Sequence, residues 1–282
     1  MMSVIRTVFS TLRRYPSAMV GSALVSLLLI VALFAPFIAP HDPLKLNPRE
    51  RFAPPSVEHI MGTDEYGRDV FSRIILGTRT SLGIGLSVTV ICAVAGGLIG
   101  LTSGYLGGRA DELIMRGMDI LMAFPGILFA LLILSMLGSS IFNVIVAISI
   151  TGIPKTARVA RSSCLNVRGE EFIEAAKARG ERTWYILLVE LLPNAVQPII
   201  VEASIKVGFV ILTASSLSFL GLGTQPPTPD WGLIIGSARE YIFEAPMLIV
   251  WPILAIAFTT ISFNLLGDGL RDILDPRELG RV

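Results

Sequence analysis

Residues 170–193 read EEFIEAAKARGERTWYILLVELLP and form a charged stretch between two long apolar runs. The first turn of this stretch is acidic and the turn before Gly180 is basic, which suits the two ends of a helix dipole. Gly180 stands where a helix commonly ends in a left-handed residue. The pattern therefore predicts a short helix over 170–180, followed by a second amphipathic helix that Thr183 caps and that ends at Pro193.

The composition excludes an ordinary water-soluble domain. Of 282 residues, 52% are hydrophobic and 16% are charged, with a mean hydropathy of +0.70, whereas soluble domains carry roughly 25% charged residues. A net charge of +1 argues against a nucleic acid as partner. We interpret Cys92 and Cys164 as packing residues. We expect no metal site, because His41 and His59 share a loop without a neighbouring cysteine.

The chain is expected to be an all-α integral membrane protein with six transmembrane helices, since about 20 apolar residues cross a bilayer core. The expected layout is a tail over 1–14, a first span over 15–40, an external loop over 41–79 and a core over 80–282. Within the core we expect spans at 80–108, 113–137, 141–157, 194–223 and 245–267, a loop over 158–193 between the fourth and fifth spans, and a charged tail over 268–282.

Lysine and arginine are more frequent in the tails and in the loop 158–193 than in the first loop, which the positive-inside rule assigns to opposite sides. Both termini and the loop 158–193 are therefore expected in the cytoplasm. In the first loop, Asp69 is expected to cap a short helix whose apolar residues face inward. Gly96, Gly100 and Gly104 recur at every fourth position, which predicts close packing against a neighbouring helix.

Three polar or irregular positions within the spans are candidates for a transport pathway. Glu202 and Lys206 are four residues apart, so they can form an ion pair on one helix face, or they can line the pathway. Pro125 is expected to kink the third span, and such a kink is tolerated where neighbouring protein satisfies the freed carbonyls.

The sequence contains no Gly-Lys pair, so it has no P-loop that could hold ATP phosphates. It also shows no constellation of acid, base and nucleophile typical of an enzyme, and the spans lack the chain of Asp, Glu or His expected of a proton-coupled carrier. If this protein pumps a solute, another chain must supply the energy.

Several motifs resemble those of a known family. Glu174-Ala175-Ala176, Gly180 and Leu192-Pro193 resemble the loop motif of the membrane subunits of ATP-binding-cassette (ABC) importers, except that Glu190 stands where isoleucine is usual. GTDEYGRDVFSR (62–73), FLGLG (219–223), DWG (230–232) and FNLLGDGLRD (263–272) are typical of the shorter permease subunit of dipeptide, oligopeptide and nickel importers.

This resemblance implies a type I importer fold with a cytoplasmic coupling helix, in a multi-pass protein of the bacterial inner membrane. The chain would form half of the pathway for di- or oligopeptides; nickel, glutathione or opines are alternatives, and a secondary transporter is a distant one. Its partners would be a homologous permease, two cytoplasmic ATPase subunits, an external solute-binding protein and membrane lipid. ATP and magnesium would bind to the ATPase, with no cofactor and no catalytic site on this chain.

The resemblance also implies roles for individual residues. The residues expected to couple this chain to the ATPase are Phe172, Glu174, Ala175, Ala176, Arg179, Gly180, Leu192 and Pro193. The candidates for an external loop or gate are Thr63, Asp64, Gly67, Arg68 and Asp69.

Overall fold

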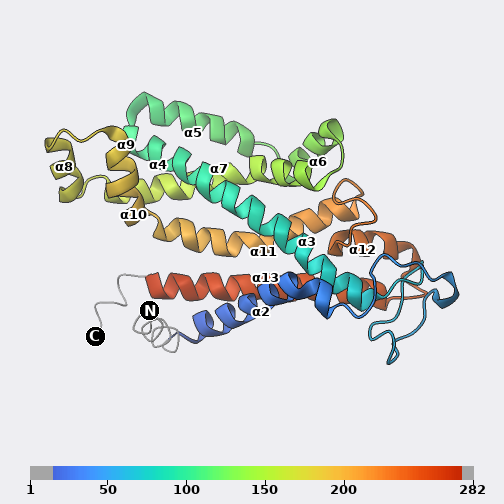
Figure 1. The fold of residues 1–282 in the computed structure, drawn as a ribbon. Coiled ribbons are helices and arrows are strands. Elements are labelled where there is room, and N and C mark those ends of the chain that lie inside the picture. The colour runs from blue at the N-terminus through green and yellow to red at the C-terminus, as the bar shows by residue number, and fades with distance from the viewer. Residues whose placement is uncertain (1–14, 275–282) are drawn as a thin grey trace.

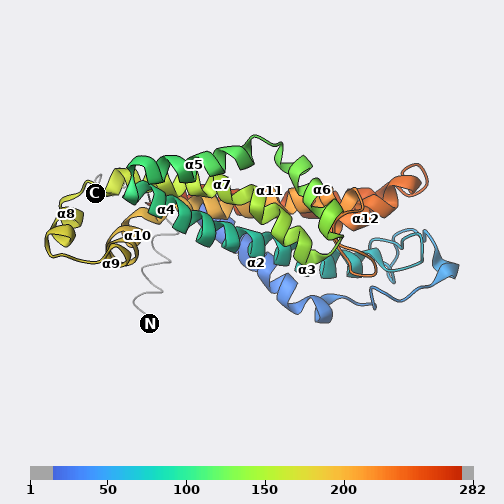
Figure 2. The same ribbon diagram turned by 90° about the horizontal axis from the view of Figure 1, so that it is seen from above.

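A computed structural model describes residues 15–274, so the expected tail over 1–14 and the end of the C-terminal tail lie outside the described residues. Long helices lie side by side along one axis (Figure 1). Helices α8, α9 and α10 lie at one end of this bundle, and the loop between α2 and α3 lies at the other, as Figure 2 shows from a second direction. No β-strand occurs within residues 15–274.

The helices of the bundle are bounded as follows: α2 Pro16–Ile38, α3 Val70–Ile91, the π-helical turn η2 Cys92–Gly96, α4 Gly97–Leu106, α5 Gly108–Met122, α6 Gly126–Leu137, α7 Ile141–Val167, α11 Gln197–Phe219 and α13 Met247–Leu274. The shorter elements are η1 Pro48–Glu50, α8 Glu171–Ala178, α9 Thr183–Tyr185, the π-helical η3 Ile186–Leu191, α10 Leu192–Ala195, α12 Trp231–Ala238 and η4 Arg239–Tyr241.

The helix after the first loop begins earlier than expected. Asp69 caps it as predicted, since its carboxylate accepts from the Ser72 backbone N–H at 2.8 Å. The expectation of a short separate helix is wrong, because the helix continues from Val70 to Leu106, 37 residues, through the π-helical turn. Arg73 does not interrupt it, because its charge lies 3.4 Å from the Asp64 carboxylate.

The third span is broken rather than kinked. α5 and α6 meet at 82°, and the helix is interrupted over Ala123–Pro125. The position of the bend was predicted from Pro125, but its size was underestimated. Because proline has no N–H and disfavours the helical conformation of the residue before it, α5 ends instead of bending.

Judged by length and composition, fewer helices than the six predicted can cross a membrane. Four helices within the described chain, α2, α3–α4, α11 and α13, are long and apolar enough to cross a membrane, and the bent pair α5–α6 would make five. The expected fourth span, α7, is 27 residues long, but Lys155, Arg158 and Arg161 make its second half polar. The count of six therefore stays a prediction.

Glycines bring α4 and α7 close together, as their spacing predicted. A Cβ on Gly100 would lie 2.1 Å from the carbonyl oxygen of Ala157, and one on Gly104 would lie 2.9 Å from Cys164 Cβ. Both cysteines are buried free thiols, as expected of packing residues. α4 and α7 therefore lie against each other near the α8 end of the bundle (Figure 1).

The two ends of the described chain also lie at the α8 end of the bundle (Figure 1). There Ser17 Oγ, at the start of α2, donates to Asp272 Oδ2, near the end of α13, at 3.3 Å. The helix α8 and both described chain ends therefore share one side of the molecule, and the loop between α2 and α3 occupies the opposite side.

Candidate functional site

The helix predicted from residues 170–180 is present as α8, and its ends form as the sequence indicates. Glu170 occupies the N-cap position, and Gly180 has a φ of +75°. The Glu181 N–H donates to the Ala176 carbonyl at 3.2 Å and the Gly180 N–H donates to the Lys177 carbonyl at 2.9 Å. This pair of bonds satisfies carbonyls that a helix end otherwise leaves free.

α8 has one buried face and one free face. Ile173 and Ala176 are fully buried, in a cluster that includes Leu187 and Leu191 of η3. Phe172 is 37% exposed and Ala175 lies open on the other side. The inner face therefore fixes the helix to the end of the bundle, and the outer face presents one aromatic ring beside a small residue.

The second half of this loop differs from the prediction. Thr183 is the first residue of α9 rather than its cap, a position that Arg182 occupies without a side-chain hydrogen bond. The helix also continues past Pro193 to Ala195, through the π-helical η3. Pro193 is the second residue of α10, directly after η3, and it does not end the helix.

One ion pair joins the two halves of the loop, since Arg179 Nη2 donates to Glu190 Oε1 at 3.0 Å. A second lies within α8, where Lys177 Nζ donates to Glu174 Oε1 at 2.8 Å. Glu190, the one departure from the resembled motif, therefore binds the cation that follows α8. Exposed pairs of this kind contribute about 0.2–1 kcal/mol each, so the buried face of α8 contributes more to its position than they do.

The eight expected coupling residues are close together but not equivalent. Glu174, Ala175, Arg179, Pro193 and the partly exposed Phe172 lie on the surface, Leu192 is half-buried, and Ala176 is inside. Gly180 is exposed and shapes the end of α8. The available contact surface is thus the outer face of α8 with the residues that follow it.

The five residues expected at an external gate lie inside the loop between α2 and α3. Thr63, Asp64, Gly67, Arg68 and Asp69 are all buried. The Asp64 carboxylate accepts from the backbone N–H of Arg68 at 2.9 Å and from Arg68 Nε at 2.7 Å. Gly67 has a φ of +71°. These residues fold the loop, and they do not form its outer surface.

The ion pair predicted within the fifth span is present. Lys206 Nζ lies 3.0 Å from Glu202 Oε1 on α11. The same ammonium group donates to the Gly152 carbonyl at 3.1 Å and to the Thr156 hydroxyl, both on α7. The pair therefore joins α11 to α7 inside the bundle. Pro125, the other pathway candidate, is exposed at the α5–α6 break.

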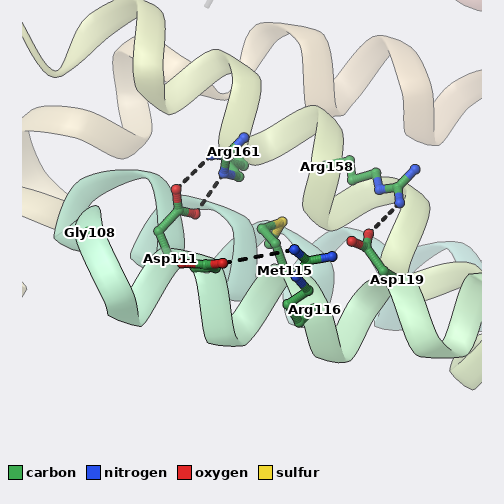
Figure 3. A pocket seen from close by; sticks show the side chains of 8 residues that line it. Gly108, Asp111, Met115, Arg116, Asp119, Arg158 and Arg161 are labelled. Carbon is green, nitrogen blue, oxygen red and sulfur yellow. Dashed lines mark hydrogen bonds and ion pairs between the residues drawn. The ribbon is translucent and has the colours of Figure 1, made fainter.

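A charged cavity of about 520 Å³ between α5 and α7 was not predicted (Figure 3). Arg161 donates to both oxygens of Asp111, each bond being 2.6 Å long, and Arg158 donates to Asp119. The spacing of Asp111 and Asp119, two helical turns apart, signals a polar stripe. Of these four residues, only Arg158 and Arg161 entered the count of basic residues from which the orientation was predicted. These ion pairs, between aspartates of α5 and arginines of α7, connect the two helices.

Comparison with known proteins gives consistent matches along the chain. Residues 96–279 match the family model described as binding-protein-dependent transport system inner membrane component, and residues 3–55 match the N-terminal TM domain of oligopeptide transport permease C. The chain is 41% identical over 272 residues to a dipeptide transport system permease protein of Alkalihalophilus pseudofirmus, covering 96% of this chain and 90% of the relative.

Two further similarities complete the comparison. The chain is 46% identical to a glutathione transport system permease protein of Escherichia coli O6:K15:H31, covering 95% of this chain and 89% of that protein. A solved structure titled as an inward-facing conformation of the MetNI methionine ABC transporter superposes with a TM-score of 0.56 at 18% identity. It covers 72% of this chain and 97% of that chain.

Proposed function

Because this chain belongs to the family of binding-protein-dependent transport system inner membrane components, we propose that it is a permease subunit that imports di- or oligopeptides with energy from a separate ATPase. It has the type I ABC importer permease fold. Glutathione is the second candidate solute, because relatives at 43–46% identity carry that name. The observation that carries the proposal is α8, a capped helix fixed at one end of the bundle.

The outer face of α8 is the proposed contact with the ATPase. Phe172, Glu174 and Ala175 are exposed together at the end of the molecule, where a groove on a partner can receive them. Ala176 and Gly180 act indirectly, since one packs the helix onto the bundle and the other terminates it. Leu192 and Pro193 continue this surface. ATP and magnesium would bind to the partner, and their effect would reach the spans through α8.

The remaining partners follow from the two ends of the bundle. The α8 end, with both described chain ends, faces the cytoplasm in this proposal, since the segments there are rich in arginine and lysine. The folded loop between α2 and α3 then faces outward, toward a solute-binding protein. A homologous permease completes the pathway. Glu202, Lys206 and Pro125 are proposed as parts of its wall, where the ion pair would hold α11 against α7.

Neighbouring residues of α8 provide the test. Ile173→Ala removes a fully buried side chain, so it should destabilise the chain itself by about 2–5 kcal/mol. Phe172→Ala removes a ring that is 37% exposed, so it should lower the free energy of unfolding of the chain by less than Ile173→Ala does. If the ring fills a pocket on the ATPase, the same change should weaken association of the two proteins about tenfold or more.

The measurements are thermal unfolding of the purified chain, co-purification of the ATPase and peptide uptake by proteoliposomes holding the whole complex. Ala175→Arg is a second variant on the outer face, and it should act as Phe172→Ala does. Normal association and normal uptake in both outer-face variants would contradict the assignment of α8 as the coupling helix.

A further inference from the structure

Three side chains that commonly bind metals meet in the loop between α2 and α3. His41 follows the end of α2, His59 lies in the middle of the loop, and Asp69 caps α3. One ligand atom from each lies within 4.8 Å of the other two. His59 Nδ1 is 2.9 Å from Asp69 Oδ1, and His41 Nδ1 is 3.9 Å from Asp69 Oδ2.

One atom of this group points to a ligand independently. His41 Nδ1 is buried and has no hydrogen-bond partner within residues 15–274. Buried polar atoms in proteins are almost always paired, so each exception needs an explanation. The Asp69 carboxylate is the nearest acceptor, but 3.9 Å is too long for a hydrogen bond. A cation between His41 Nδ1 and Asp69 would supply the partner that this nitrogen lacks.

The groups around the three side chains hold them as metal ligands are usually held. The outer nitrogen of His59, Nε2, lies 3.3 Å from Glu50 Oε2, and that carboxylate is itself bonded by Asn47. A carboxylate on the far nitrogen of a ligating histidine fixes the ring and its tautomer. On the other side, the His41 backbone N–H donates to Ser72 Oγ, which in turn donates to Asp69 Oδ2.

The distances between the ligand atoms, the adjoining cavity and the types of ligand together indicate the kind of metal. Metal–ligand bonds of about 2.0–2.1 Å place neighbouring ligands of a tetrahedral zinc site about 3.3 Å apart, and the observed 2.9 and 3.9 Å lie on either side of that value. A cavity of about 360 Å³ reaches His41, His59 and Asp69, so water can supply a fourth ligand. Two imidazoles suit zinc or its first-row neighbours better than magnesium or calcium, which prefer oxygen.

We propose that His41 Nδ1, His59 Nδ1 and the Asp69 carboxylate bind one divalent transition-metal ion of the zinc class. The ion would join the segment after α2 to the first turn of α3, so that the first helix of the bundle and the second are linked at their loop end. This site differs from the expectation, drawn from the absence of cysteine near the histidines, that the loop holds no metal. It does not depend on the proposed transport function.

The test is binding of Co²⁺ alone to the full-length chain in detergent, purified with an affinity tag free of histidine and followed by the visible absorption of tetrahedral cobalt. The expected result is one equivalent of Co²⁺ bound and displaced by one equivalent of Zn²⁺. His41→Gln and His59→Gln should each lower the affinity at least 100-fold. Glu50→Gln, which removes the carboxylate behind His59, should lower it about 10–100-fold. Glu58→Gln is the matched control, because Glu58 lines the same cavity outside the ligand set.

A second measurement covers the case in which a variant disturbs the loop. Zn²⁺ should raise the thermal unfolding temperature of the unchanged chain and of Glu58→Gln, but not that of His41→Gln. Failure of the unchanged chain to bind one equivalent, or binding by His41→Gln as tight as by the unchanged chain, would overturn the proposal.

Discussion

Replacing Gly180 gives the sharpest prediction, because a glycine is required there for one reason only. Its φ is +75°, and a Cβ built on it would meet nothing within 4 Å. The cost of a side chain is therefore purely conformational. A non-glycine residue in the left-handed region costs about 1–2 kcal/mol, which corresponds to about a 5–30-fold fall in the ratio of capped to frayed helix.

The order of substitutions follows from the same cause. Asparagine tolerates the left-handed region, so Gly180→Asn should be mildest, Gly180→Ala intermediate and Gly180→Val worst, since a β-branched side chain resists this conformation most. Fraying breaks the bond from the Glu181 N–H to the Ala176 carbonyl. Hydrogen exchange of the Glu181 amide should therefore accelerate about 5–30-fold in Gly180→Ala and more in Gly180→Val.

The functional readout uses the whole transporter in proteoliposomes. Gly180→Val should leave a complex that assembles poorly or hydrolyses ATP without uptake, whereas Gly180→Asn should retain most of its uptake. Equal exchange rates in all three variants would refute the conformational argument. Faster exchange together with normal uptake in Gly180→Val would refute the coupling role of α8.

Two further predictions concern the bundle and its outer loop. Gly100→Ala should lower the free energy of unfolding by about 1–3 kcal/mol, because its Cβ would lie 2.1 Å from the Ala157 carbonyl oxygen. The matched control in the same unfolding experiment is Gly117→Ala, where a Cβ meets nothing within 4 Å. This control should be neutral or slightly stabilising. Burial raises the pKa of Glu65 above its ordinary 4.5, although Arg68 Nη2 lies 3.2 Å from the carboxylate. The folded state therefore binds this proton more tightly than the unfolded state, and the stability of the chain falls as pH rises through the folded pKa. At pH 7, Glu65→Gln should unfold at a higher temperature than the unchanged chain, and the difference should shrink toward pH 4; a difference that grew on acidification would contradict this sign.

Local spacing predicted the elements whose causes are local. The charges and Gly180 predicted α8, the Asp69 side chain predicted the start of α3, and the interval between Glu202 and Lys206 predicted their pair. Each of these depends on residues within a few positions of one another, so a sequence pattern contains the whole cause.

Pairings across long distances in the chain could not be predicted in this way. Asp111 meets Arg161 across 50 residues, and His41 approaches Asp69 only because the loop folds back. The sequence separation of neither pair indicates that its two residues come into contact. The buried position of Thr63 was missed for the same reason, since its hydroxyl donates to the Glu50 carbonyl, 13 residues earlier in the loop.

The sharp corner between α5 and α6 has a consequence for what can surround the molecule. Backbone groups released from a helix over Ala123–Pro125 need hydrogen-bond partners, and acyl chains provide none. Wherever this corner sits at membrane depth, protein or water has to border it. At that depth this flank of the bundle is bordered by protein or by water, and not by lipid.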